Sequence, residues 1–209
     1  YPSGSQTLLV GEGNFSFASA LATKWGDAAT LIATAFDPQA VCAGKYADSA
    51  AHTANVVARG GQVLYGVDAT QLADDKRFVP QTFDIVAFHF PHVGLGIKDQ
   101  DRNVAANQAL LTGFFHAAKP LLKRPASGQG SRYAEWGAIH VTLKTGMPYE
   151  LWNVKRLAFY AGLRVLEAFP FDAARWPGYT HRRTLGFKPG LSVDANAEIL
   201  KRECKTYVF

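Results

Sequence analysis

The sequence predicts an α/β fold: a mostly parallel, seven-stranded sheet with helices on both faces. Short apolar runs alternate along the chain with stretches whose apolar residues recur at helical spacing, which is typical of parallel sheets. The runs Leu8–Val10 and Asp84–Phe88 are almost wholly apolar, as strands buried on both faces should be. The chain has 209 residues, 48% of them hydrophobic, so we expect one core and a single domain over residues 1–209.

Most of the expected strands are runs of apolar and β-branched residues bounded by Gly, Pro or Asp. The last two lack a clear helix between them, so we expect an antiparallel pair at one edge of the sheet. The strands are expected at Thr7–Val10, Thr30–Ala35, Gln62–Val67, Phe83–Phe90, Ala138–Leu143, Arg164–Phe169 and Lys205–Phe209.

The expected helices combine helical spacing of apolar residues with a nearby Gly or Pro that ends the pattern. They are Phe17–Trp25 before Gly26, Gln39–Ala58 before Gly60, Val104–Phe115 before Pro120, and Leu151–Ala161 before Gly162.

The composition excludes several classes of protein. The net charge of +5 favours a polyanionic partner such as nucleic acid. Cys42 and Cys204 are isolated, which argues against a disulfide scaffold or a zinc cluster and suits a reducing compartment. No apolar run is long enough to span a bilayer, and the first residues show no signal-peptide pattern. Because the sequence starts at Tyr1 rather than Met, we expect it to be a piece of a longer protein.

The most informative motif follows the first strand, where Gly11-Glu12-Gly13-Asn14-Phe15-Ser16 leads into the first helix. Glycines let the backbone turn tightly and approach a ligand, and the helix start offers free amide donors, so this loop indicates a nucleotide or cofactor site. A dinucleotide dehydrogenase would use the same loop. Ser16, however, stands where close helix packing wants Gly or Ala, which disfavours NAD. No Gly-Lys-Ser/Thr follows, so a phosphate-binding P-loop is excluded.

Three further strand ends carry polar residues, and ligands bind at the carboxyl ends of parallel strands. Asp37 follows the second strand, where an acidic side chain can accept hydrogen bonds from ribose hydroxyls. Asp68 follows the third, where it can meet an adenine amino group. Either carboxylate could instead cap the next turn or helix. His89-Phe90-Pro91-His92 ends the fourth strand, and the alternative for both histidines is a buried, satisfied ring or a solvated loop residue.

Two motifs together, Gly11–Phe17 and Phe88–Gly94, resemble those of a known family. Matching stretches at Gly96–Asn103, Pro148–Asn153 and Pro177–Thr184 extend the resemblance over nearly the whole chain. The family is that of the eukaryotic uridine-N3 methyltransferases of large-subunit (25S/28S) ribosomal RNA, and the fungal members are the most similar. The resemblance implies a class I (Rossmann-like) methyltransferase fold, which the terminal antiparallel strand pair also fits.

The resemblance further implies a methyl transfer from S-adenosylmethionine to N3 of a uridine. The expected partner is ribosomal RNA or a pre-ribosomal particle, in the nucleolus or nucleus. The protein is expected to act as a monomer, without a metal ion and without contact with a membrane. For Phe15 and Phe88 a place in the core is the alternative. The cofactor-binding residues are expected to be Gly11, Glu12, Gly13, Asn14, Phe15, Ser16, Asp37, Asp68 and Phe88.

The expected catalytic motif is His89, Pro91 and His92. N3 of neutral uracil carries a proton, and His89 or His92 is a sensible base because neutral imidazole is available near pH 7. Two residues depart from the family pattern: Asn14 stands in place of Asp, and His89 in place of an Asn expected to orient the target nitrogen. The second departure keeps a rival hypothesis open, a non-catalytic RNA-binding ribosome-assembly factor. Methylation of another RNA position or of a small molecule is a further alternative.

RNA contacts are expected from a segment near the C-terminus. N3 lies on the Watson–Crick edge, so the enzyme must take an unpaired uridine or flip one out. Cations and aromatics interleave in this segment, which suits phosphate contact plus base stacking. The alternative is a solvated loop with its two aromatic rings packed back onto the sheet. The RNA-binding residues are expected to be Arg175, Trp176, Tyr179, His181, Arg182 and Arg183, with Lys188 nearby.

Overall fold

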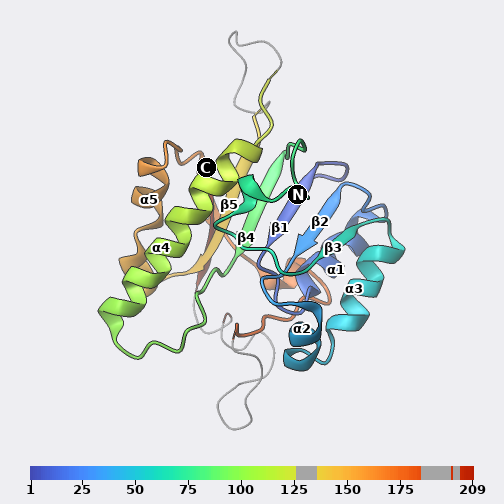
Figure 1. Ribbon diagram of the computed structural model, residues 1–209, viewed down its shortest axis with the longest axis horizontal. Helices are drawn as coiled ribbons and strands as arrows, with labels where there is room; N and C mark the ends of the chain where they lie inside the picture. Colours follow the sequence, from blue (N-terminus) through green and yellow to red (C-terminus); the bar gives the residue numbers. More distant parts are fainter. Residues whose placement is uncertain (126–135, 185–198, 200–202) are drawn as a thin grey trace.

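A computed structural model describes residues 1–125, 136–184, 199 and 203–209. Its strands form one seven-stranded sheet in the order β3-β2-β1-β4-β5-β7-β6 (Figure 1). The pairs from β3 to β5 are parallel, whereas β7 runs antiparallel to both β5 and β6. The predicted fold class and the terminal antiparallel pair are confirmed. The strands are β1 Thr7–Val10, β2 Leu31–Thr34, β3 Gln62–Leu64, β4 Ile85–His89, β5 Ala138–Lys144, β6 Glu167–Pro170 and β7 Cys204–Val208.

Helices cover both faces of the sheet, and the alternation of side chains along each strand decides which core a residue joins. Leu8 and Val10 point to the core that contains Phe114 of α4. Leu9 between them points to the opposite core, with Phe17 of α1. Helix α1 packs on α3, and α4 packs on α5. The helices are α1 Ser16–Trp25, α2 Gln39–Lys45, α3 Ser49–Ala58, α4 Gln100–Ala118 and α5 Val154–Tyr160.

The prediction of one continuous helix over Gln39–Ala58 is wrong, because the chain leaves the helix at Tyr46 and resumes it at Ser49. Tyr46 is extended (φ −135°, ψ 97°) and buried, and its hydroxyl donates a hydrogen bond to the carbonyl oxygen of Arg183 at 2.8 Å. The extended residue between the two helices is therefore held by a contact with a residue far along the chain. Local spacing of apolar residues carries no sign of it.

The strand order reverses between β1 and β4, which are neighbours in the sheet although β2 and β3 lie between them in the sequence. Loops on the carboxyl side of such strands diverge and leave a crevice, which is where open α/β sheets bind their ligands. Among the described residues, no helix is both long and apolar enough to cross a membrane, and no group of three or more His, Cys, Asp or Glu is placed to hold a metal ion.

Candidate functional site

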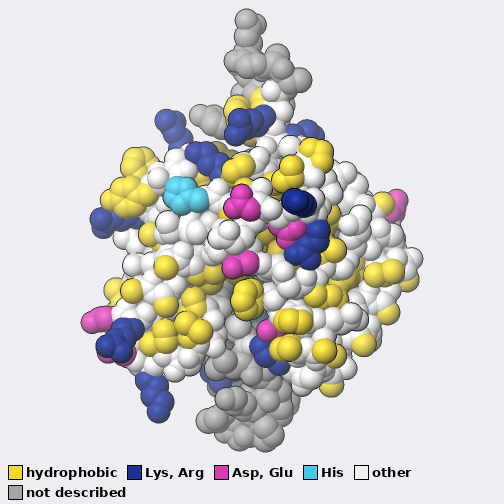
Figure 2. Space-filling view, in the orientation of Figure 1, with side chains coloured by type: hydrophobic (Ala, Val, Ile, Leu, Met, Phe, Trp, Pro, Cys, Tyr) yellow, Lys and Arg dark blue, Asp and Glu magenta, His cyan; other side chains and the backbone are white. Residues whose placement is uncertain are grey.

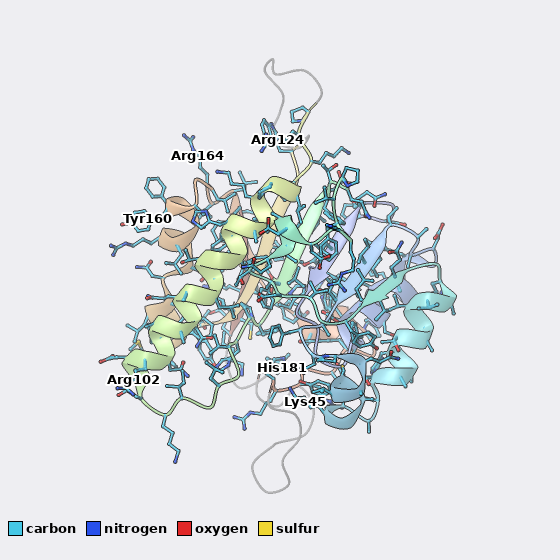
Figure 3. All side chains as sticks on the ribbon, viewed as in Figure 1. Lys45, Arg102, Arg124, Tyr160, Arg164 and His181 are labelled. Atoms are coloured by element: carbon cyan, nitrogen blue, oxygen red, sulfur yellow. The ribbon has the colours of Figure 1, made fainter. Side chains whose placement is uncertain are left out.

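A cavity of about 660 Å³ opens at the carboxyl ends of β1, β2 and β4. The glycine loop after β1 lines it on one side, and the segment after β4 lines it on another. Lys45 and His181, which also line it, lie close together below the sheet in Figure 3. Most of the residues expected at the cofactor and the acceptor line this space: Gly11, Glu12, Gly13, Asn14, Ser16, Asp37, Asp68, Phe88, His89, His92, Tyr179, His181 and Arg182.

The backbone of the glycine loop is shaped by two residues with positive φ. Gly11 has φ +68°, and a Cβ there would overlap the ring of Phe88, so only glycine fits. Phe15 has φ 62° and starts helix α1, with its ring fully buried against Tyr65. Phe15 thus lies outside the cavity lining, in the core, which was the alternative to a cofactor contact for this residue. Phe88 lines the cavity and also packs on Phe114.

Asn14 joins the glycine loop to the segment that follows β6. Its Nδ2 donates to Asp48 Oδ2 at 3.0 Å and to Thr180 Oγ1 at 2.9 Å, and its Oδ1 accepts from the Ser16 hydroxyl at 2.8 Å. Ser16 Oγ also accepts from Thr180 N at 3.0 Å. Asp48 Oδ2 accepts from Arg182 as well, at 2.8 Å. We call Tyr179–Thr184 the strap, because these contacts fasten it across the loop.

The two acidic residues at the ends of β2 and β3 each have one oxygen engaged by the protein. Asp37 Oδ2 forms an ion pair with Lys45 Nζ at 2.7 Å, and it does not cap α2. Asp68 Oδ1 accepts from both the backbone N–H and the hydroxyl of Thr70, so the capping alternative is observed for Asp68. The second oxygen of each carboxylate accepts no hydrogen bond from the part of the chain that the structure describes. Both carboxylates line the cavity.

Glu12 is an acidic group in the wall of the cavity. Its Oε2 accepts a hydrogen bond from Ala18 N at 3.2 Å. Burial raises the pKa of Glu12 to about 7, more than the hydrogen bond from Ala18 lowers it. A carboxylate in this position can compensate a positive charge on a ligand at neutral pH.

His89 has both ring nitrogens engaged. Nε2 lies 2.9 Å from the Tyr1 hydroxyl, and Nδ1 lies 2.7 Å from Thr142 Oγ1. Burial, with a smaller contribution from His140, lowers the pKa of His89 to about 3. The ring is therefore neutral at pH 7. It is also weakly basic and has no nitrogen left over for a substrate, so its geometry suits positioning better than proton removal.

His92 lies three residues after His89 and makes a different contact. Its Nδ1 accepts a hydrogen bond from Gly94 N at 2.9 Å, and burial lowers its pKa. Pro91 between the two histidines is buried and lies outside the cavity lining. Val93, the residue after His92, donates its N–H to Asn107 Oδ1 at 3.0 Å.

The expected RNA-binding residues separate into two groups. Tyr179 is buried against Phe17, and the ring centroid of Trp176 lies 4.8 Å from that of Phe17. Both aromatics thus pack back onto the body of the domain, as the alternative to base stacking predicts. Arg175 and Arg183 are exposed. Arg182 forms an ion pair with Asp48. His181 packs on Phe90 at 4.7 Å. Lys188 lies outside the described residues.

Charge alone does not locate an RNA surface on the face in view. Figure 2 shows Lys and Arg side chains scattered around that face, interspersed with acidic and hydrophobic ones. Proximity to the cavity is therefore the remaining criterion for an RNA-binding surface. Arg182 and Arg183 of the strap meet it, since the strap borders the cavity.

The comparison with known families decides the identity of this fold. The profile of the BMT5-like family, described as "rRNA (uridine-N3-)-methyltransferase BTM5-like", matches residues 8–183. The chain belongs to this family. The resemblance predicted from the motifs is thereby confirmed, while the assignment to a fungal branch stays a prediction.

Relatives of this BMT5-like chain cover most of its length. An uncharacterized protein of Arabidopsis thaliana is 33% identical over 100% of this chain and 94% of its own. The heavy metal-associated isoprenylated plant protein 41 of the same species is 32% identical over 100% of this chain, which spans only 38% of that protein. The 25S rRNA (uridine(2634)-N(3))-methyltransferase of Saccharomyces cerevisiae is 25% identical over 97% of this chain and 71% of its own.

A solved structure of an antibiotic-related methyltransferase shares the fold of this BMT5-like chain. It superposes with a TM-score of 0.50 and 13% identity over 99% of this chain and 87% of its own. The order of the strands, with its terminal antiparallel pair, is thus that of a Rossmann-like methyltransferase.

Several residues around the cavity of this family member were not expected from the sequence. Tyr46 and Asp48 lie where the expected helix breaks, and Thr180 binds the glycine loop from the strap. Thr142 reaches His89 from β5. Among these residues, the sequence marks only Thr180, which belongs to the family motif Pro177–Thr184. The motif does not indicate which residues Thr180 contacts.

Proposed function

We propose that this chain transfers a methyl group from S-adenosylmethionine to N3 of a uridine in large-subunit ribosomal RNA. The observation that carries the proposal is the cavity at the reversal of strand order, in a chain of the BMT5-like family. Its volume of about 660 Å³ lies within the range of small-molecule sites. It is lined by the glycine loop on one side and by two strand-end carboxylates on the other.

The residues of the cavity fit S-adenosylmethionine part by part. The free oxygen of Asp37 suits the ribose hydroxyls, and that of Asp68 suits the adenine amino group. Phe36, two residues past the end of β2, is 68% exposed, although the residues of β2 are buried. It lines the cavity beside Asp37, where a nucleoside base would cover it. Glu12 suits the positive charge of the methionine part. When bound, S-adenosylmethionine supplies a methyl group made electrophilic by its sulfonium.

The acceptor uridine enters from the side of His92 and His181. Because N3 is hidden in a base pair, the uridine is unpaired or flipped out before it reaches the cavity. His89 holds the end of β4 through Thr142 and Tyr1, and so fixes the start of the loop that meets the base. Arg183 and Arg175 provide cations for phosphates near the entrance.

The cellular context follows from the same proposal. Methylation of large-subunit ribosomal RNA places the protein in the nucleolus or nucleus, acting on ribosomal RNA or a pre-ribosomal particle. A single domain working as a monomer suffices for this chemistry, since every proposed residue comes from one chain.

Two measurements in series test the function. Calorimetric titration with S-adenosylmethionine should give micromolar affinity, and NAD should not bind. The chain is then incubated with S-adenosylmethionine and unmodified large-subunit ribosomal RNA, and the digested nucleosides are analysed by mass spectrometry for N3-methyluridine. RNA binding without methyl transfer would favour the ribosome-assembly factor. Methylation of free uridine, or of another position, would favour the other alternative.

A further inference from the structure

The protonation pattern of the His92 ring is fixed by the backbone of its own loop. Nδ1 accepts the Gly94 N–H at 2.9 Å, and a nitrogen that accepts a hydrogen bond from an amide carries no proton itself. In the neutral ring the proton is therefore on Nε2. The turn requires glycine, because Gly94 has φ +67° and a Cβ there would lie 2.7 Å from Thr184 Cγ2.

The surroundings of His92 keep the ring neutral. Burial lowers the pKa of His92, and the charges of Lys144 on β5 and Arg183 on the strap act in the same direction. The ring also packs near Trp152, with centroids 6.0 Å apart. The Nε2–H is therefore the one donor that the neutral ring of His92 can offer to a ligand in the cavity that this residue lines.

A buried amide holds the loop that carries this donor. Asn107 of α4 is fully buried, and its Oδ1 accepts the Val93 N–H at 3.0 Å. Its Nδ2 donates to the carbonyl oxygen of Asn103 at 2.8 Å and to Asn103 Oδ1 at 3.0 Å. Because both ends of the amide are engaged, it cannot flip without losing these bonds. The loop from Pro91 to Gly94 is thus preorganised from α4.

We propose that His92 donates a hydrogen bond to a carbonyl oxygen of the acceptor uracil, and that Asn107 positions it for this. The inference rests on the proposed function and replaces the idea of His92 as the base. Loss of the N3 proton to solvent water leaves an anion whose charge is shared by N3 and the two adjacent carbonyl oxygens. A preorganised donor at one oxygen stabilises that anion and raises the fraction of reactive uracil.

Two substitutions of His92 separate a donor from a base. His92→Gln keeps a side-chain N–H donor without a titratable base, whereas His92→Phe keeps a ring beside Trp152 without a donor. We expect His92→Gln to retain the rate within about tenfold and His92→Phe to lose about a hundredfold. The affinity for S-adenosylmethionine should be unchanged in both. The wild-type rate should keep rising from about pH 6 to about pH 9 as bound uracil ionises, and the His92→Phe profile should move to higher pH.

Asn107 is tested without any turnover. Nitrogen-15 NMR of the imidazole rings should show His92 in wild type as the Nε2–H tautomer, and Asn107→Leu should shift it toward a mixture. Asn55→Leu is the matched control, since Asn55 of α3 also donates to several oxygens, those of Ser19 and Thr23, away from this loop. An Nδ1–H tautomer in wild type would overturn the proposal.

The outcomes also separate this inference from the proposed function. If wild type makes N3-methyluridine but His92→Gln and His92→Phe fall equally, with a wild-type rate that levels off near neutral pH, His92 is a base and the donor role is wrong. If wild type transfers no methyl group to any uridine, the proposed function itself fails and the inference fails with it.

Discussion

Arg182 Nη2 donates a hydrogen bond to Asp48 Oδ2 at 2.8 Å, and the same carboxylate oxygen accepts from Asn14. One carboxylate thus joins the start of α3, the glycine loop and the strap. Burial alone would raise the pKa of Asp48, but the hydrogen bonds from Asn14 and Arg182 outweigh it and hold the pKa below its ordinary value. An arginine that the sequence offers as an RNA contact is therefore occupied in shaping the cavity.

Asp48→Asn should loosen the strap and weaken binding of S-adenosylmethionine. Because the pKa of Asp48 is lowered in the folded state, its contribution is present above its ordinary pKa and is lost as pH falls through the folded value. We expect a loss of about 1 kcal/mol at pH 7, measured by urea unfolding, that disappears as pH falls below the lowered pKa of Asp48. Asp75→Asn, which breaks the pair with Arg77 outside the cavity, should leave ligand affinity unchanged.

Gly11→Ala should be destabilising and should abolish cofactor binding. The added Cβ overlaps Phe88 and the residue must keep a positive φ, so we expect a loss of about 2 to 3 kcal/mol in the free energy of unfolding. Gly26→Ala is the control, because Gly26 has φ +81° with no atom within 4 Å of its built Cβ. A loss at Gly26 as large as at Gly11 would show that backbone strain, and not the Phe88 contact, decides the effect.

Glu12→Gln should stabilise the free protein at alkaline pH. The pKa of Glu12 is about 7 in place of its ordinary 4.5, so the folded state loses stability as pH rises between these values and the buried group ionises. Urea unfolding should find the variant about 3 kcal/mol more stable at pH 8 and equal to wild type at pH 4. Glu150→Gln is the matched control for the substitution itself, because it lies outside the cavity lining and still leaves an Oε1 to accept from Gly146 N.

The same carboxylate predicts a proton release on binding. A cationic ligand lowers the pKa of a neighbouring acid, so S-adenosylmethionine should displace protons from wild type near pH 6.5. Calorimetry in buffers of different ionisation enthalpy measures the number of protons released on binding. Proton release that persists in Glu12→Gln would assign it to another group.

Asp37→Asn should weaken S-adenosylmethionine binding by about tenfold, since an amide is a poorer acceptor for ribose hydroxyls than a carboxylate. Asp84 offers a matched control, because it forms a similar ion pair with Lys123 at 2.9 Å, before the start of β4. Asp84→Asn should lower stability without changing the affinity. Equal loss of affinity in both variants would point to a general effect on folding.

The exposed arginines just before the strap and within it should set the salt dependence of RNA binding. Arg175→Ala and Arg183→Ala should each weaken binding to ribosomal RNA and reduce the slope of log affinity against log salt by about 1. Arg164→Ala is the control, because Arg164 lies on the far side of the molecule from Lys45 and His181 in Figure 3. An unchanged slope in both the Arg175 and the Arg183 variant would remove these residues from the RNA interface.

The parts of the fold that were predictable are those with a local physical cause. Buried strands such as β1 and β4 need continuous apolar residues, and the turn at Gly11 needs a residue without a side chain. The break at Tyr46 is not predictable in this way, because the hydrogen bond that holds this residue is to Arg183, far along the chain. A periodic pattern reports only what happens within a few residues.

Many of the residues that line the cavity could be named from the sequence, but their arrangement could not, and Phe15 and Pro91 lie outside the lining. The sequence by itself determined the order of strands and helices, and with it the edge where the glycine loop, Asp37 and Asp68 gather. Only the tertiary structure decided that Asp48 holds Arg182 and that the nitrogens of His89 are engaged. The reason is physical: propensity and apolar spacing act over one or two turns, whereas protonation state and hydrogen-bond partner depend on every group that packing brings within about 3 Å.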